Sequence, residues 1–254
     1  MGERAYFAVC RALGRLLRSA RYSRVQIVDE GHQPQVHKSR ALYAPVLILL
    51  SGPLLRILDT GVRVLAQREW EERERQIQRQ LRGTSMRIDA GGTLVMPRLA
   101  GRTLATLLED PTLEARVRNE AIERAVVALA GFHRLGLTHG DAMAENVLID
   151  LEARAAHWFD FETMHDAHRP AAWRRADDVR ALLVTCLLRT AREQRAAILQ
   201  LILDVYADEA VTRALAAGFA SAWRRPLVFH LAQAGLSFQC DREIGRLLGE
   251  RLGE

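Results

Sequence analysis

Cysteine is scarce in this sequence. The 254 residues contain only Cys10, Cys186 and Cys240. Their odd number and wide spacing fit neither a disulfide framework nor the closely spaced ligands of a structural zinc site. We therefore expect free thiols and a reducing compartment. A chain of this length can bury a full hydrophobic core in one domain.

Long apolar segments are also absent. The most apolar stretch runs from Tyr43 to Leu55 and is interrupted by Pro45, Gly52 and Pro53. A membrane-spanning helix needs about twenty apolar residues, so this stretch is too short to cross a bilayer. We expect a buried insertion, with contact to a membrane interface as the alternative.

The first twenty residues lack the uninterrupted apolar core of a signal peptide, because arginines break it. They instead predict a basic amphipathic helix, with apolar residues at helical spacing: Tyr6, Phe7, Val9, Cys10, Leu13, Leu16 and Leu17. Such a helix lies on an anionic membrane or packs on the fold with its arginines in solvent. The formal charge of +5 favours anionic partners without choosing among them.

Lysine is the rarest basic residue here, since 35 of the 36 basic side chains are arginines and Lys38 is the single lysine. The segments Val25–Asp29 and Gln35–Lys38 predict two strands joined by a turn over Glu30–Pro34. A lysine is a compact charge that fits between phosphate oxygens, and arginine does not replace it there. We therefore predict that Lys38 binds nucleotide phosphates.

A charged helix is predicted from Val62 to Arg82. Its residue Glu74 shares one face with Trp70 and Ile77 by the helical period. A carboxylate among apolar residues needs a partner, and Lys38 is the candidate. Glu69 and Glu72 are alternatives to Glu74 in that pair.

The next elements follow from turn and cap residues. Strands Ser85–Asp89 and Thr93–Arg98 predict a hairpin around Ala90–Gly92. A helix is predicted from Pro111 to Leu135, with Asp110 as its cap. The sequence after Asp177 predicts further helices to the end of the chain, without repeats or linkers.

The stretch His139–Asn146 carries the strongest chemical signal. Asp141 and Asn146 lie five residues apart on a loop after the long helix, and Asp160-Phe161-Glu162 follows the predicted strands Asn146–Ile149 and Ala156–Phe159. An acid and an amide at this spacing can hold a hydroxyl nucleophile beside a divalent cation. Mg²⁺ prefers such oxygen ligands together with substrate phosphates. This is most of what phosphoryl transfer requires of a protein.

The pattern His-Gly-Asp-x4-Asn followed by Asp-Phe-Glu resembles the catalytic and metal-binding loops of the protein-kinase-like fold. Glycine after the histidine is similar to atypical branches: aminoglycoside and choline kinases, lipopolysaccharide core kinases, and the minimal kinases of tRNA threonylcarbamoylation. The resemblance covers roughly residues 36–188. It departs from the family in lacking a glycine-rich loop before Lys38, and in carrying Met143 where many relatives have lysine or histidine.

The resemblance implies a two-lobed α+β fold in a single domain. Residues 1–98 would form a reduced β-rich lobe and residues 99–254 a helical lobe. Asp141 would act as the catalytic base, Asn146 and Asp160 as Mg²⁺ ligands, and Lys38 with Glu74 as the ATP-phosphate site. Asp178 would hold the backbone of the catalytic loop.

The implied function is phosphoryl transfer from ATP to a hydroxyl of an envelope sugar or glycolipid. We expect a cytoplasmic protein with peripheral contact to the inner face of an anionic cell membrane, and no nucleic-acid partner. A small serine/threonine protein kinase with a protein acceptor is the second enzyme hypothesis. A pseudokinase that binds partners without turnover is the alternative from another class, favoured by the missing glycine-rich loop.

Overall fold

The computed structural model describes residues 22–29, 34–57, 59–83, 86–220 and 238–252. The helix predicted before residue 20 lies outside these ranges. Among the described helices, none combines the length and the apolar character needed to cross a membrane.

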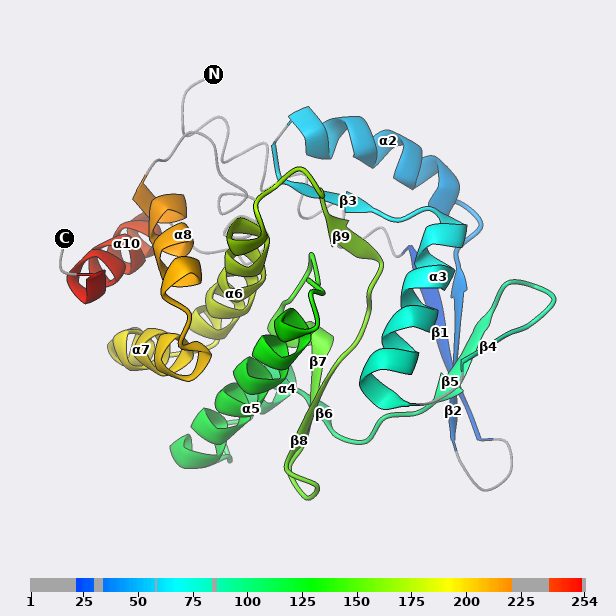
Figure 1. The fold of residues 1–254 in the computed structure, drawn as a ribbon. Coiled ribbons are helices and arrows are strands. Elements are labelled where there is room, and N and C mark those ends of the chain that lie inside the picture. Colours follow the sequence, from blue (N-terminus) through cyan, green and yellow to red (C-terminus); the bar gives the residue numbers. More distant parts are fainter. Residues whose placement is uncertain (1–21, 30–33, 58, 84–85, 221–237, 253–254) are drawn as a thin grey trace.

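The predicted N-terminal strands and hairpin form one antiparallel sheet in the order β1-β2-β5-β4 (Figure 1). Its strands are β1 (Ser23–Val28), β2 (Gln35–Arg40), β4 (Arg87–Ile88) and β5 (Leu94–Pro97). Lys38 pairs in register with Val25 on one side and with Leu94 on the other. It therefore lies on an inner strand, where neighbouring backbones fix its position.

The apolar stretch after β2 forms helix α2 (Ala44–Ile57). The prediction of a buried insertion was wrong, because one side of α2 is exposed: Leu49 is 74% and Leu50 65% accessible. The other side is buried through Ala44, Ser51 and Leu55. Hydrophobicity alone does not distinguish a buried helix from one with an exposed apolar side.

The charged helix begins later than predicted. Val62–Val64 forms strand β3 and pairs with β9 (Thr163–His165), so these residues belong to a two-stranded sheet. Helix α3 (Gln67–Ile77) follows and ends in a π-helical turn over Gln78–Arg82. Trp70, Leu65 and Leu94 form a small buried cluster between α3 and the first sheet.

The segment that connects β5 to the long helix has a different structure around Asp110 from the one predicted. Residues Arg102–Thr103 form β6, and a short helix α4 (Leu104–Glu109) comes next. Asp110 is the C-terminal cap of α4, so its predicted role at the start of the long helix was wrong. Its carboxylate accepts hydrogen bonds from Thr112 instead. The long helix α5 spans Ala115–Arg134.

The strand pair predicted after the loop is confirmed. β7 (Val147–Asp150) pairs with β8 (Ala155–Trp158), and β6 completes a three-stranded antiparallel sheet beside α5. The remaining described α-helices are α6 (Ala171–Leu188), α7 (Arg195–Tyr206), α8 (Glu209–Ala220) and α10 (Phe238–Leu252). The structure is thus of the α+β class, as predicted.

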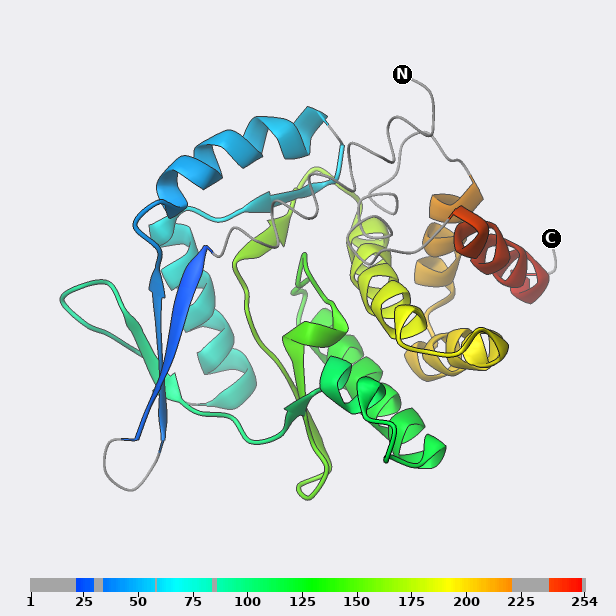
Figure 2. The same cartoon turned by 180° about the vertical axis from the view of Figure 1, so that it is seen from behind.

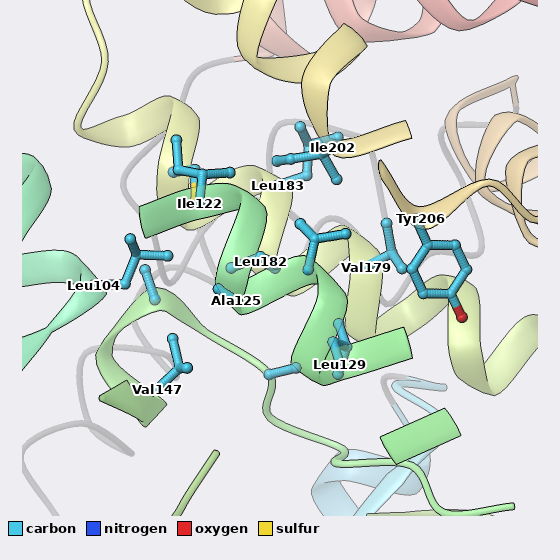
Figure 3. Packing of buried hydrophobic residues seen from close by; sticks show 14 of the residues in the cluster. Leu104, Ile122, Ala125, Leu129, Val147, Val179, Leu182, Leu183, Ile202 and Tyr206 are labelled. Atoms are coloured by element: carbon cyan, nitrogen blue, oxygen red, sulfur yellow. The ribbon is translucent and has the colours of Figure 1, made fainter. Parts of the chain in front are cut away.

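A second and much larger hydrophobic cluster joins α4, α5, α6, α7 and β7. In Figure 3, Ile122, Ala125 and Leu129 of α5 face Val179, Leu182 and Leu183 of α6. Cys186 in α6 is a buried free thiol, as predicted. The loop that carries Asp141 runs between α5 and β7, so it is anchored at both ends in this core.

Candidate active site

The backbone of the loop after α5 is held by one buried carboxylate. Asp178 of α6 accepts hydrogen bonds from the backbone N–H groups of His139 (2.7 Å) and Gly140 (2.8 Å). It also lies 2.9 Å from Nε2 of His133. Burial alone would raise the pKa of Asp178, but His165 and His133 hold it below its usual value. Asp178 is therefore ionised and has the loop-holding place predicted for it.

Gly140 allows a tight crossing at this point. Its φ of +83° lies in the left-handed region, and a Cβ there would lie 3.0 Å from the Cα of Met164. A side chain would push the loop away from β9. The glycine thus brings Asp141 next to the segment that follows Asp160.

Asp141 and Asn146 are directly connected. The amide nitrogen of Asn146 donates to the backbone carbonyl of Asp141 (2.8 Å) and to its carboxylate Oδ2 (2.9 Å). Asn146 is buried, whereas Asp141 is half-buried. Since the amide nitrogen is used inside the loop, the carbonyl oxygen of Asn146 is the atom that it can offer to a cation.

His139 joins this loop to the segment of Asp160. The ring is fully buried, and its Nε2 lies 2.9 Å from the backbone carbonyl of Phe159. Burial lowers the pKa of His139 to about 4, so the neutral ring donates from Nε2. Phe161 packs between His139, at 4.7 Å between ring centroids, and Phe132, at 5.5 Å.

The depressed pKa of His139 predicts a loss of stability in acid. Between about pH 6.5 and pH 4 the unfolded chain binds a proton that the folded chain does not, so stability falls as pH falls through this window. The loss attributable to His139 is roughly 3 kcal/mol. Urea unfolding of His139→Gln should show a shallower decline over this window than the parent.

The exposed His168 supplies the control for this measurement. His168→Gln should keep the pH dependence of the parent. Parallel curves for His139→Gln and the parent would contradict the assignment of the acid sensitivity to His139.

Lys38 lies in the middle of an acidic cluster. Its Nζ is 2.5 Å from Oδ1 of Asp160, 3.0 Å from Oε1 of Glu162 and 3.5 Å from Oε1 of Glu74. Burial alone would lower the pKa of Lys38, but the three carboxylates raise it well above its ordinary value. Lys38 is therefore charged at any physiological pH. The structure brings together the three residues Lys38, Glu74 and Asp160 that were predicted from different parts of the sequence.

The two alternatives to Glu74 lie elsewhere. Glu69 is half-exposed and pairs with Arg63 at 2.9 Å. Glu72 is exposed. Glu74 has this position because it is on the buried face of α3 with Trp70 and Ile77.

The pKa values of Asp160 and Glu162 are shifted in opposite directions, although both carboxylates contact Lys38. Burial would raise the pKa of Asp160, but Lys38 holds it below its usual range. Burial raises the pKa of Glu162, and the negative charge of Asp160 raises it further. Asp160 has φ +70°, a strained conformation for a non-glycine residue. The side chain of Asp160 is 37% exposed, so it remains accessible from solvent.

Arg40 is a residue of this cluster that sequence reasoning missed. Its guanidinium lies 3.2 Å from Oε2 of Glu162, donates to the carbonyl of Leu65 at 3.0 Å, and sits 4.6 Å above the ring of Trp70. The signal was available in principle, because residues two apart on a strand point to the same face. The side chain of Arg40 thus points to the same face of β2 as that of Lys38, and its ion pair positions Glu162 in the site.

A second buried network supports β9, and it was also missed. His165 lies between Oγ1 of Thr138 (3.0 Å) and Oδ2 of Asp177 (3.1 Å), while Asp177 accepts from Arg180 at 2.7 Å. Each of these four side chains has a polar or charged group whose burial without a partner would cost free energy. The contacts connect the start of the loop, β9 and α6, so the three segments around Asp141 and Asp160 are held together.

The donor set fits Mg²⁺ bound jointly with phosphates better than a metal site made by the protein alone. In the described residues no group of three or more His, Cys, Asp or Glu side chains is arranged to hold a metal. Mg²⁺ typically takes one or two protein oxygens and completes its shell with water and substrate phosphates. The carboxylate of Asp160 and the side-chain Oδ1 of Asn146 are oxygen donors of that kind.

Comparison with known proteins supports the chemistry suggested by this arrangement. A search of curated proteins found no match. Residues 75–204, about half of the chain, match the model of the family described as lipopolysaccharide kinase (Kdo/WaaP). The match includes Asp141, Asn146, Asp160 and Asp178. The chain therefore belongs to the lipopolysaccharide kinase (Kdo/WaaP) family, and it is a phosphotransferase that acts on a hydroxyl group of a sugar.

Proposed function

We propose that this kinase transfers the terminal phosphoryl group of ATP, in the presence of Mg²⁺, to a hydroxyl of a lipopolysaccharide sugar. The observation that carries the proposal is the convergence of Lys38 with Glu74 and Asp160, in a segment that is hydrogen-bonded through Phe159 to His139 and Asn146 of the catalytic loop. This is the set of groups needed to hold phosphates, a cation and a hydroxyl together.

In this proposal each side chain has one task. Asp141 orients the acceptor hydroxyl and takes its proton as the oxygen attacks. Lys38, positioned by Glu74, contacts phosphate oxygens as a compact charge. Asp160 and Asn146 hold the cation, which neutralises charge on the phosphates when it is bound. Glu162, held by Arg40, remains as a counter-charge beside Lys38.

The kinase-like arrangement in two lobes is part of the same proposal. Support comes from the two hydrophobic clusters, a small one under the first sheet and a large one among the helices. We propose a lobe boundary near residue 98, directly after β5. The site would then lie where the β-rich lobe with Lys38 faces the helical lobe with Asp141.

Labelled ATP and a fractionated envelope extract test the proposed acceptor. With Mg²⁺, the proposal predicts that label appears in the lipopolysaccharide fraction and that a chelator removes this transfer. Label in proteins alone would indicate a protein kinase. Binding of ATP without label in any fraction would indicate a pseudokinase, and either result would contradict the proposal.

Lys38→Arg is expected to reduce kcat/KM for ATP on the order of 10²-fold, because small displacements of phosphate-binding groups have effects of this size. The positive charge is kept, but the planar guanidinium does not fit among Glu74, Asp160 and Glu162. Steady-state kinetics over a range of ATP concentrations measure this effect.

The matched control is Arg87→Lys on the exposed edge strand β4, which should behave like the parent. A Lys38→Arg variant with parental kinetics would show that Lys38 does not bind the nucleotide.

A lipopolysaccharide acceptor is anchored in a membrane, so we also propose peripheral contact of the kinase with an anionic membrane surface. The basic segment before residue 20 predicts such contact by charge, since each basic residue near an anionic surface contributes about 1 kcal/mol. The described part of the chain contains a further candidate surface.

A further inference from the structure

Helix α2 carries an apolar surface that the phosphoryl-transfer site does not use. Five of the eleven large apolar side chains exposed in the described residues lie in one short stretch: Leu42 (91%), Tyr43 (47%), Val46 (58%), Leu49 (74%) and Leu50 (65%). We call these five residues the α2 patch. Val46, Leu49 and Leu50 lie within α2, and their spacings of three and four place them on one side of the helix, while Leu42 and Tyr43 lie in the turn just before it. A contiguous exposed patch of this kind marks a binding surface.

The α2 patch faces away from the rest of the described fold. The opposite side of the helix, with Ala44, Ser51 and Leu55, is buried toward β3. In Figures 1 and 2 α2 lies along the outer edge of the molecule, and no other described element lies beyond it. The described part of the chain thus contacts the helix from one side and leaves the patch exposed.

The charge around the patch suits an anionic surface. The sequence has no acidic residue between Glu30 and Asp59, whereas Arg56 is exposed in the last turn of α2. The patch itself is aliphatic with one tyrosine, Tyr43, at its end. Aliphatic residues with an interfacial tyrosine and neighbouring basic residues are typical of helices that lie on membranes. Protein interfaces instead combine aromatic and arginine anchors with a polar rim.

The patch is also connected to the candidate active site through a short series of packed elements. α2 packs on β3, β3 pairs with β9, and β9 follows Glu162 without interruption. A surface bound at α2 would therefore be separated from the site by one pair of strands. This is a suitable place for a substrate whose sugar is phosphorylated while its lipid stays in the bilayer.

We propose that the α2 patch docks this kinase onto the lipid surface of an anionic membrane. The choice of a membrane as partner rests on the proposed lipopolysaccharide acceptor. The docking itself rests on the exposure and charge of α2, so it is testable without any phosphoryl transfer.

The test is co-sedimentation of the full chain with vesicles of phosphatidylcholine, with and without phosphatidylglycerol. The parent should bind the vesicles that contain phosphatidylglycerol. The variant Val46→Ser, Leu49→Ser, Leu50→Ser should bind them at least about tenfold more weakly, because burial of apolar side chains drives interfacial binding. The matched control Val127→Ser, Leu135→Ser, Leu188→Ser removes exposed apolar groups from the helical part and should bind like the parent.

Three outcomes would overturn the proposal: absence of vesicle binding by the parent, equal binding by the α2 variant, or a dimer of the parent that the α2 variant dissociates. Transfer to a delipidated core oligosaccharide, measured with the same proteins, separates this proposal from the proposed function. The α2 variant should keep that transfer. A parent that binds vesicles more tightly than the α2 variant but phosphorylates no sugar would contradict the kinase proposal and leave the docking surface supported.

Discussion

Replacing Asp141 with asparagine is expected to lower kcat by about 10²–10⁴-fold, the usual size of a general-base contribution. The substitution keeps the shape of the side chain and an oxygen that can accept from Asn146. It removes the carboxylate that we propose takes the proton of the acceptor hydroxyl. Affinity for ATP with Mg²⁺, measured by calorimetry, should stay near that of the parent.

Glu145 in the same loop provides the matched control. Its carboxylate is 44% exposed and pairs with Arg189 at 2.6 Å, away from the hydrogen bonds of Asp141. Glu145→Gln should retain most of the parental turnover. Equal kcat for Asp141→Asn and the parent would exclude Asp141 as the base.

Asp178→Asn is expected to cost about 3–5 kcal/mol of stability, because it breaks a buried charged network by removing one partner. An amide offers one acceptor oxygen where the carboxylate now accepts from both His139 and Gly140. One backbone N–H of the loop would be left unsatisfied in a buried place. Denaturant unfolding of the variant and the parent measures this loss.

Asp204 is the comparison residue for that experiment. It is half-exposed and pairs with Arg251 at the surface. Asp204→Asn should leave the unfolding midpoint unchanged, since exposed ion pairs contribute little. A stable Asp178→Asn protein would show that the loop is held chiefly by contacts other than the carboxylate.

The local parts of the site could be predicted from sequence. Asp141 and Asn146 lie in one short loop, so their spacing already determines that they meet. The contact of Lys38 with Glu74 could be predicted because a carboxylate on the apolar face of a helix requires a charged partner. Asp178 was found through family resemblance, and its hydrogen bonds match that expectation.

The parts that depend on tertiary packing could not be predicted in this way. Val62–Val64 continues a helical pattern, but pairing with β9 makes it a strand. The network of His165, Asp177 and Arg180 joins residues whose spacing carries no recognisable motif. The α2 patch was predicted as buried because composition reports hydrophobicity and not which face another element covers.

The proposed activity is tested most directly with lipopolysaccharide whose core carries no phosphate. This substrate is incubated with the purified kinase, ATP and Mg²⁺, and its mass is measured before and after. The expected result is a gain of one phosphate on a core sugar. A chelator should abolish this gain. The Asp141→Asn variant should produce the gain more slowly, by the same factor by which its kcat is lowered. An unchanged mass at stoichiometric amounts of folded, ATP-binding parent protein would contradict the proposed activity.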